Sequence, residues 1–151
     1  VADISRRAEL GLAANGRYLE ALGVVGEPSP TRFLLDPVSK PVVRQGRAYR
    51  PLRPIAPEEA KLFKLFLDGQ FLLQGFRNKD VRERLLGDPG TDPKARQQAA
   101  GKITRLFRLL RAHRLIRKVS KTFYYRVTPR GQHLMSTALQ LRELNLYALA
   151  A

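Results

Sequence analysis

Residues 99–131, AAGKITRLFRLLRAHRLIRKVSKTFYYRVTPRG, hold the pattern that decides the fold. Apolar side chains recur in their first part at the spacing of one helix face, at Ala99, Ile103, Leu106, Phe107 and Leu110. Residues 115–119 and 123–127 then have the composition of two strands, and the short segment between them suits a turn. Thr128 followed by Pro129 is typical of the start of another helix. The predicted order is therefore helix, hairpin and helix.

The residues before this stretch predict two more helices. Pro57, followed by two glutamates, suits the first turn of one helix, because acids are favoured at the positive end of the helix dipole. We expect Asn78 to cap the next helix, which runs to Leu86. Residues 87–93 are rich in Gly, Asp and Pro and predict a loop, and residues 94–113 form the helix before the hairpin. The expected fold class is mainly α with a small β-hairpin (α+β).

The chain divides into three predicted segments. Residues 1–22 read as a helical arm, residues 23–56 as a proline-rich connecting segment and residues 57–151 as the main domain. Seven of the ten prolines fall within residues 23–57, which excludes a long helix there. Residues 49–52 are a candidate for a short strand that pairs with the hairpin. The arm either packs on the main domain, which we favour, or pairs two subunits or joins an upstream domain.

Charge and composition narrow the class of protein. The formal net charge is +15, which implies a polyanionic partner, with nucleic acid favoured over an anionic membrane surface. The sequence has no cysteine, which excludes disulfides, thiolate metal sites and thiol catalysis. No apolar run reaches the length of a membrane-spanning helix, and the first residues lack the pattern of a signal peptide.

Basic residues concentrate on the helix and hairpin described above. Residues 94–142 contain 13 Lys or Arg and no Asp or Glu, whereas an ordinary exposed helix mixes both signs. With Ile103 facing the core, the opposite helix face presents Gln and Arg, which can bond adenine and guanine edges respectively. The alternative is a charged face that meets only solvent. The predicted nucleic-acid-binding residues are Arg77, Lys79, Gln97, Gln98, Gly101, Lys102, Thr104, Arg105, Arg108, Arg117, Lys118, Lys121, Tyr124 and Arg126.

The second strand of the hairpin contains three consecutive aromatic residues. Successive strand residues point to opposite faces, so we expect Phe123 and Tyr125 to face the core. Tyr124 then faces outward, where its hydroxyl can bond a phosphate. Gly101, on the preceding helix, removes a side chain at a point where the backbone can approach a groove closely.

No set of residues has the pattern of a catalytic or metal site. The two histidines, His113 and His133, lack the spacing of metal ligands, and Asp88 and Asp92 lie in a predicted loop. The glycines form no phosphate-binding motif. We therefore expect no catalytic residue, no metal, no cofactor and no enzymatic activity.

Five segments of the sequence resemble known proteins. LLRAHRLIRKV at residues 109–119 and YYRVTPRG at residues 124–131 resemble the helix and wing of bacterial winged helix-turn-helix proteins, including regulators of the multiple-antibiotic-resistance type. NGRYLEAL from Asn15, KPVVRQGRAYRPLRPIAPEEA from Lys40 and LLQGFRNKDVRERL from Leu72 resemble the C-terminal part of a family of longer bacterial proteins of unclear function. The resemblance implies a winged-helix module of prokaryotic origin, no named reaction, and a preceding domain that is missing here.

Two positions depart from this resemblance. Position 114 is Arg where such helices usually end in Gly, so Arg114 either adopts a left-handed cap or the helix ends differently. The connection between residues 86 and 94 is longer than the usual turn of a helix-turn-helix, which affects the angle between the two helices and hence base reading.

Three functions are compatible with these observations. The first is a double-stranded DNA-binding module, either a regulator or the DNA-reading part of a larger mobile-element or processing protein. The second is an RNA-binding winged helix in a ribonucleoprotein, because phosphate contacts do not distinguish the two polymers. The third is a protein-interaction domain. For the first, we expect duplex DNA as partner, with a homodimer or an upstream domain as further partners, no membrane, and a location in the bacterial cytoplasm at the nucleoid.

Overall fold

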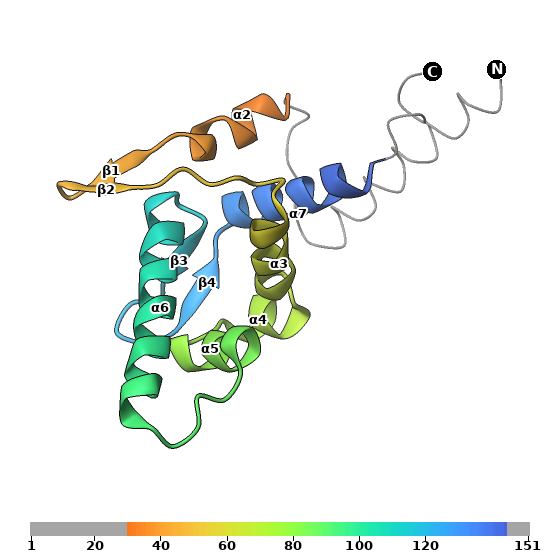
Figure 1. Ribbon diagram of the computed structural model, residues 1–151. Coiled ribbons are helices and arrows are strands. Elements are labelled where there is room, and N and C mark those ends of the chain that lie inside the picture. The colour runs from red at the N-terminus through yellow and green to blue at the C-terminus, as the bar shows by residue number, and fades with distance from the viewer. Residues whose placement is uncertain (1–29, 145–151) are drawn as a thin grey trace.

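The computed structural model describes residues 30–144 (Figure 1). Its elements in chain order are α2 (Arg32–Leu35), the 3-10 helix η1 (Pro37–Ser39), β1 (Val42–Arg44), β2 (Arg47–Tyr49), α3 (Pro57–Phe66), α4 (Gly69–Gln74), α5 (Asn78–Leu86), α6 (Pro93–Ala112), β3 (Ile116–Lys118), β4 (Tyr125–Val127) and α7 (Pro129–Glu143). The predicted arm, residues 1–22, lies outside the described residues. The described part confirms a mainly α class with a small β-hairpin, and it adds a second hairpin, β1–β2.

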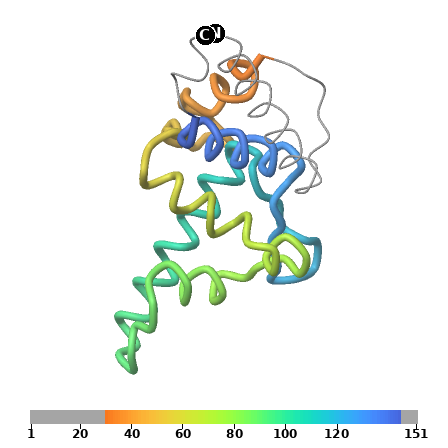
Figure 2. Tube along the Cα trace, turned by 90° about the vertical axis from the view of Figure 1, so that its right-hand side faces the viewer, coloured from red at the N-terminus to blue at the C-terminus, as the bar shows by residue number. Residues whose placement is uncertain are grey.

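The helices surround the hairpin formed by β3 and β4. In Figure 1, α6 runs along one side of this hairpin and α3 with α7 along the other, while α4 and α5 lie below it. α3 packs against α7, and α5 packs against α6. Figure 2 shows that the first turns of α6, together with the loop before them, extend away from the other elements. The start of α6 is therefore accessible to a partner.

Aromatic side chains fill the centre of the domain. The ring centroids of Phe66 and Phe76 are 5.0 Å apart, and those of Phe107 and Tyr125 are 4.6 Å apart. Such pairs contribute about 0.5–1.5 kcal/mol each beyond the burial of their surface. Ile103 and Phe107 are at most 3% exposed, which confirms the apolar stripe predicted for α6.

The predicted hairpin forms, but the segment that pairs with it as a third strand differs from the prediction. β3 and β4 pair antiparallel, with Ile116 opposite Val127. Phe76, between α4 and α5, adds a single bridge: its amide donates to the Tyr125 carbonyl at 3.0 Å, and the Tyr125 amide donates to the Phe76 carbonyl at 2.8 Å. The prediction that residues 49–52 pair with this hairpin is wrong, because β2 pairs with β1 instead.

A tight turn explains why β2 pairs locally. Gln45 and Gly46, between the two strands, have φ of 50° and 74°. Two consecutive positive φ values are the requirement of a type I′ turn, whose twist matches that of the two strands it joins. Closing this two-residue connection costs far less chain entropy than pairing with a strand many residues away.

The helix ends match the predicted signals with one exception. Thr128 caps α7 as predicted, and its Oγ1 accepts a hydrogen bond from the Gly131 amide at 2.9 Å. Arg114, after α6, adopts the left-handed conformation with φ of 61°. The prediction that Asn78 caps α5 is wrong by one residue: Arg77 is the N-cap, and its amide donates to the Asp80 carboxylate at 2.8 Å.

Candidate nucleic-acid interface

The outward face predicted for α6 is accessible. Asp92 begins the helix by accepting a hydrogen bond from the Lys94 amide at 3.1 Å, and Pro93 follows in the first turn. On the side opposite the buried Ile103, Gly101 is half-buried, and the larger predicted side chains are exposed: Gln97, Gln98, Lys102, Thr104, Arg105 and Arg108. These residues line one continuous side of the helix.

The charge on this face is not neutralised within the described residues. The ion pairs of residues 30–144 join Arg50 with Glu59, Arg77 with Asp80, Lys79 with Glu83 and Arg84 with Asp68, so none of them involves α6. The helix carries the basic residues Lys94, Arg96, Lys102, Arg105, Arg108 and Arg111 and no acid. A surface of a single sign attracts a polyanion and repels other cations.

Thr104 has a structural role at the edge of this face. Its hydroxyl accepts a hydrogen bond from the Asn78 side-chain amide at 3.2 Å and donates to the Ala100 carbonyl at 3.0 Å. The same Asn78 amide donates to the Ala100 carbonyl at 3.0 Å. Asn78 thus ties the start of α5 to the middle of α6 and fixes the angle between the two helices. The sequence pattern indicates Asn78 only as a cap, because a hydrogen bond to a residue 26 positions away leaves no local signal.

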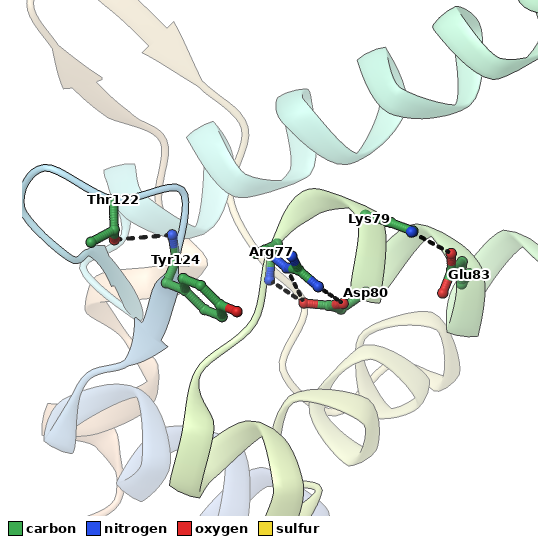
Figure 3. A network of polar contacts seen from close by, with 6 residues as sticks. All are labelled: Arg77, Lys79, Asp80, Glu83, Thr122 and Tyr124. Atoms are coloured by element: carbon green, nitrogen blue, oxygen red, sulfur yellow. Dashed lines mark hydrogen bonds and ion pairs between the residues drawn. The ribbon is translucent and has the colours of Figure 1, made fainter.

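Arg77 and Lys79, at the start of α5, already have acidic partners (Figure 3). The Arg77 guanidinium donates to both carboxylate oxygens of Asp80, each at 3.2 Å, and it lies 5.3 Å from the centre of the Tyr124 ring. Partial burial raises the pKa of Asp80, but the hydrogen bonds from Arg77 outweigh it and hold that pKa below its usual value. The ammonium of Lys79 is 3.9 Å from the carboxylate of Glu83. These two predicted residues therefore offer less free charge than those of α6.

Only some of the hairpin residues that are predicted to bind nucleic acid are free to do so. Arg117, Lys118 and Lys121 are exposed, and Lys121 lies in the turn with φ of 59°. Tyr124 is 38% exposed beside Arg77. The guanidinium of Arg126 instead donates to the carbonyls of Leu72 and Leu73, at 3.5 and 3.2 Å, so it braces the end of α4.

The predicted core position of Phe123 is wrong. Phe123 is 84% exposed, whereas Tyr125 packs against Phe107 as predicted. The strand begins only at Tyr125, and a hydrogen bond of 2.9 Å from the Val119 amide to the Tyr124 carbonyl closes the loop before it. Alternation of faces applies within a strand, so it does not extend to a residue in this loop.

The structure brings three predicted elements together at one cleft. A cleft of about 340 Å³ lies between the start of α5, the middle of α6 and the hairpin. Its lining includes four of the predicted residues, Arg77, Lys79, Thr104 and Lys118, and also Asn78, Phe107, Phe123 and Tyr125. The cleft joins the α6 face to the hairpin loop, and we use the name basic face for the exposed side of α6 together with Arg117, Lys118 and Lys121.

The described residues contain neither a metal-binding cluster nor a membrane-spanning helix. Within residues 30–144, no three His, Asp or Glu side chains gather where they could hold a metal ion. No helix in that range is long and apolar enough to cross a membrane. His113 is buried, and its Nε2 lies 2.8 Å from the Arg50 carbonyl; burial, aided by nearby arginines, lowers its pKa.

Comparison of the chain with protein-family models, with curated proteins and with solved structures finds no match.

Proposed function

We propose that the chain is a double-stranded DNA-binding module of the winged helix-turn-helix class. In this proposal α5 and α6 are the helix pair, α6 is the recognition helix and β3–β4 is the wing. The element order supports it, because the helix pair is followed by the β3–β4 hairpin, and Phe76 pairs with Tyr125 as a third strand that is one residue long. The connection between α5 and α6 is longer than the usual turn, and the hydrogen bonds of Asn78 set the helix angle instead.

The single observation that carries the proposal is the uncompensated positive charge of the basic face. An α-helix fits the major groove of B-DNA, about 12 Å wide, and duplex DNA carries one negative charge per about 1.7 Å. The outward side chains of α6 are exposed, and the first turns of the helix extend away from the other elements (Figure 2), which suits entry into such a groove. Self-repulsion between these cations destabilises the folded chain, and bound phosphates remove that repulsion.

The two parts of the basic face are assigned different tasks. Arg105 and Gln98 lie on the outward side of α6, and their forked groups can bond guanine and adenine edges. Lys121, at the tip of the wing, contacts phosphates and so contributes equally to the affinity for all sequences.

We place the protein in the bacterial cytoplasm at the nucleoid, as a regulator or as the DNA-reading part of a larger protein. Its further partner is a second copy of the chain or an upstream domain, and it has no enzymatic activity of its own.

The proposal is tested by comparing selected and random duplexes. After in vitro selection of a preferred site, Arg105→Ala should weaken binding to that site by roughly 1–3 kcal/mol and leave random DNA almost unchanged. Lys121→Ala should weaken both about equally and reduce the salt slope by about one unit. Lys64→Ala, an exposed lysine on α3, is the matched control and should change neither.

Each alternative function has its own outcome in this experiment. An RNA competitor that displaces the protein more effectively than duplex DNA at the same salt would show that the ligand is RNA. If Arg105→Ala lowers the affinity for selected and random DNA equally, α6 contacts only phosphates and does not read bases. Absence of nucleic-acid binding at low salt would remove the proposal and favour an acidic protein as partner.

A further inference from the structure

The β1–β2 hairpin covers the continuation of the α6 face. Ala112 follows Arg105 by seven residues, two helical turns, and so lies on the same side of α6. Arg105 is exposed, but Ala112 is only 4% exposed, and β1 packs against α6 in this region. The Nε of Arg44 donates to the Ala112 carbonyl at 3.2 Å. In Figure 1 the hairpin crosses the C-terminal end of α6 and its turn reaches beyond the helix.

A groove between this hairpin and α6 gathers four arginines. It measures about 580 Å³, and its lining consists of Arg44, Gln45, Arg47 and Tyr49 from the hairpin and Arg108, Arg111 and Ala112 from α6. No carboxylate lines it, and none pairs with these four guanidiniums among the residues that the structure describes. We call it the arginine groove.

The arrangement is unfavourable unless an anion is present. Arg44 and Arg47 lie directly opposite each other across the two strands, and like charges in that position destabilise a strand pair. The C-terminal end of α6 contributes a partial negative charge of only about half a unit, and Arg44 already bonds one of its carbonyls. Four full positive charges therefore remain in excess.

The length of α6 separates the arginine groove from the base-reading end. From Gln98 to Arg111 the helix rises roughly 20 Å, at about 1.5 Å per residue. A recognition helix contacts base edges with its N-terminal residues, so Arg111 lies well beyond the bases that Gln98 reaches. The groups it meets there are the phosphates of the flanking duplex.

We propose that the arginine groove binds phosphates of duplex DNA that flank the segment read by α6, so that β1–β2 acts as a second wing at the opposite end of the recognition helix. This inference rests on the proposed function and extends it. It assigns a role to Arg44, Arg47 and Arg111, and it predicts a footprint longer than that of α6 and the first wing together.

The test measures binding of the full chain to duplexes of increasing length by fluorescence anisotropy. The main variant combines Arg47→Ala with Arg111→Ala, because both side chains are exposed and neither forms a hydrogen bond within the described residues, so we expect the fold to be retained. The control combines Lys61→Ala with Lys64→Ala, which removes the same charge from the exposed side of α3. Lengths of roughly 10 and 25 base pairs provide one helical turn and more than two.

On the longer duplex the main variant should lose about two phosphate contacts. The salt slope then falls by roughly 1.8 units, so the ratio of wild-type to variant affinity should shrink roughly tenfold between about 50 and 200 mM salt. On the short duplex the main variant should bind with the same affinity as the wild type. The control variant should have the wild-type affinity on both duplexes.

Two results would overturn the inference while leaving the proposed function intact: equal affinities of wild type and main variant on every length, or equal losses for the main variant and the control. An equal loss on short and long duplexes would also overturn it, because the arginine groove would then lie inside the core footprint. A wild type that binds no duplex of either length would instead refute the proposed function itself.

Discussion

Replacing Gly101 by alanine should raise the stability of the protein and lower its affinity for DNA. Gly101 lies in the interior of α6, and an added Cβ would meet only the flexible Arg105 Nη1, at 3.6 Å. The methyl group therefore fits without strain. Alanine in a helix interior is more stable than glycine by about 0.5–1 kcal/mol, because glycine loses more backbone freedom on folding. For a domain of roughly 100 residues, that gain raises Tm by roughly 2–5 °C.

The same substitution should weaken DNA binding. Gly101 is on the outward side of α6, between Gln98 and Arg105, where the floor of the major groove lies if the proposed function is correct. A methyl group at the point of closest approach displaces the helix outward, lengthening the bonds that both side chains make to base edges. We expect the affinity for a selected site to fall at least tenfold, although the protein is more stable.

Thermal unfolding followed by circular dichroism measures the first effect, and fluorescence anisotropy with a selected duplex measures the second. Gly69→Ala in the first turn of α4 is the control for binding, because an added Cβ there meets nothing within 4 Å and α4 lies away from α6 (Figure 1). A lower Tm for Gly101→Ala would contradict the packing at that position. Unchanged affinity together with a higher Tm would show that the backbone of α6 does not approach DNA closely.

Three other substitutions test the packing, the protonation of a buried side chain and the wing. Gly131→Ala would place a Cβ 2.0 Å from the Leu115 carbonyl oxygen, so α7 must shift, and chemical denaturation should show a loss of roughly 1–3 kcal/mol. Burial lowers the pKa of His113 below its ordinary 6.5. The stability that neutral His113 contributes is therefore complete above pH 6.5 and is lost as the pH falls below it. His113→Gln should flatten this pH dependence of the unfolding free energy in urea titrations, and an unchanged profile would exclude His113 as its source. Phe123→Ser should change stability by no more than about 0.5 kcal/mol, because the ring is 84% exposed, yet weaken duplex binding if the loop enters the minor groove; equal affinity would place the loop outside that groove.

The parts of the fold that could be predicted from sequence depend on local signals. The stripe that buries Ile103 and Phe107 repeats within one helix, and the cap that Thr128 supplies acts within three residues. The prediction for Tyr125 is correct because that residue lies in a strand, whereas the prediction for Phe123 is wrong because Phe123 lies in the loop before that strand. Local periodicity is informative only as far as the element extends.

The parts that could not be predicted depend on contacts between distant segments. Phe76 pairs with Tyr125 across 49 positions through two backbone hydrogen bonds, and a single paired residue has no strand pattern. Gln45 does not signal a tight turn as Asn or Gly would, so the β1–β2 pairing was missed. The arginine groove combines Arg47 with Arg111, which meet only because the hairpin packs on α6.

The most direct test of the basic face is a map of amide chemical shifts. The full chain, labelled with ¹⁵N, is titrated with a duplex that carries its preferred site, and perturbed backbone amides are assigned to residues. We expect the largest changes on the first half of α6 and on residues 117–124 of the wing, while the amides of the exposed side of α3 stay unchanged. Changes concentrated on α3 and α7, with α6 unaffected, would contradict the assignment of this face as the DNA-binding surface.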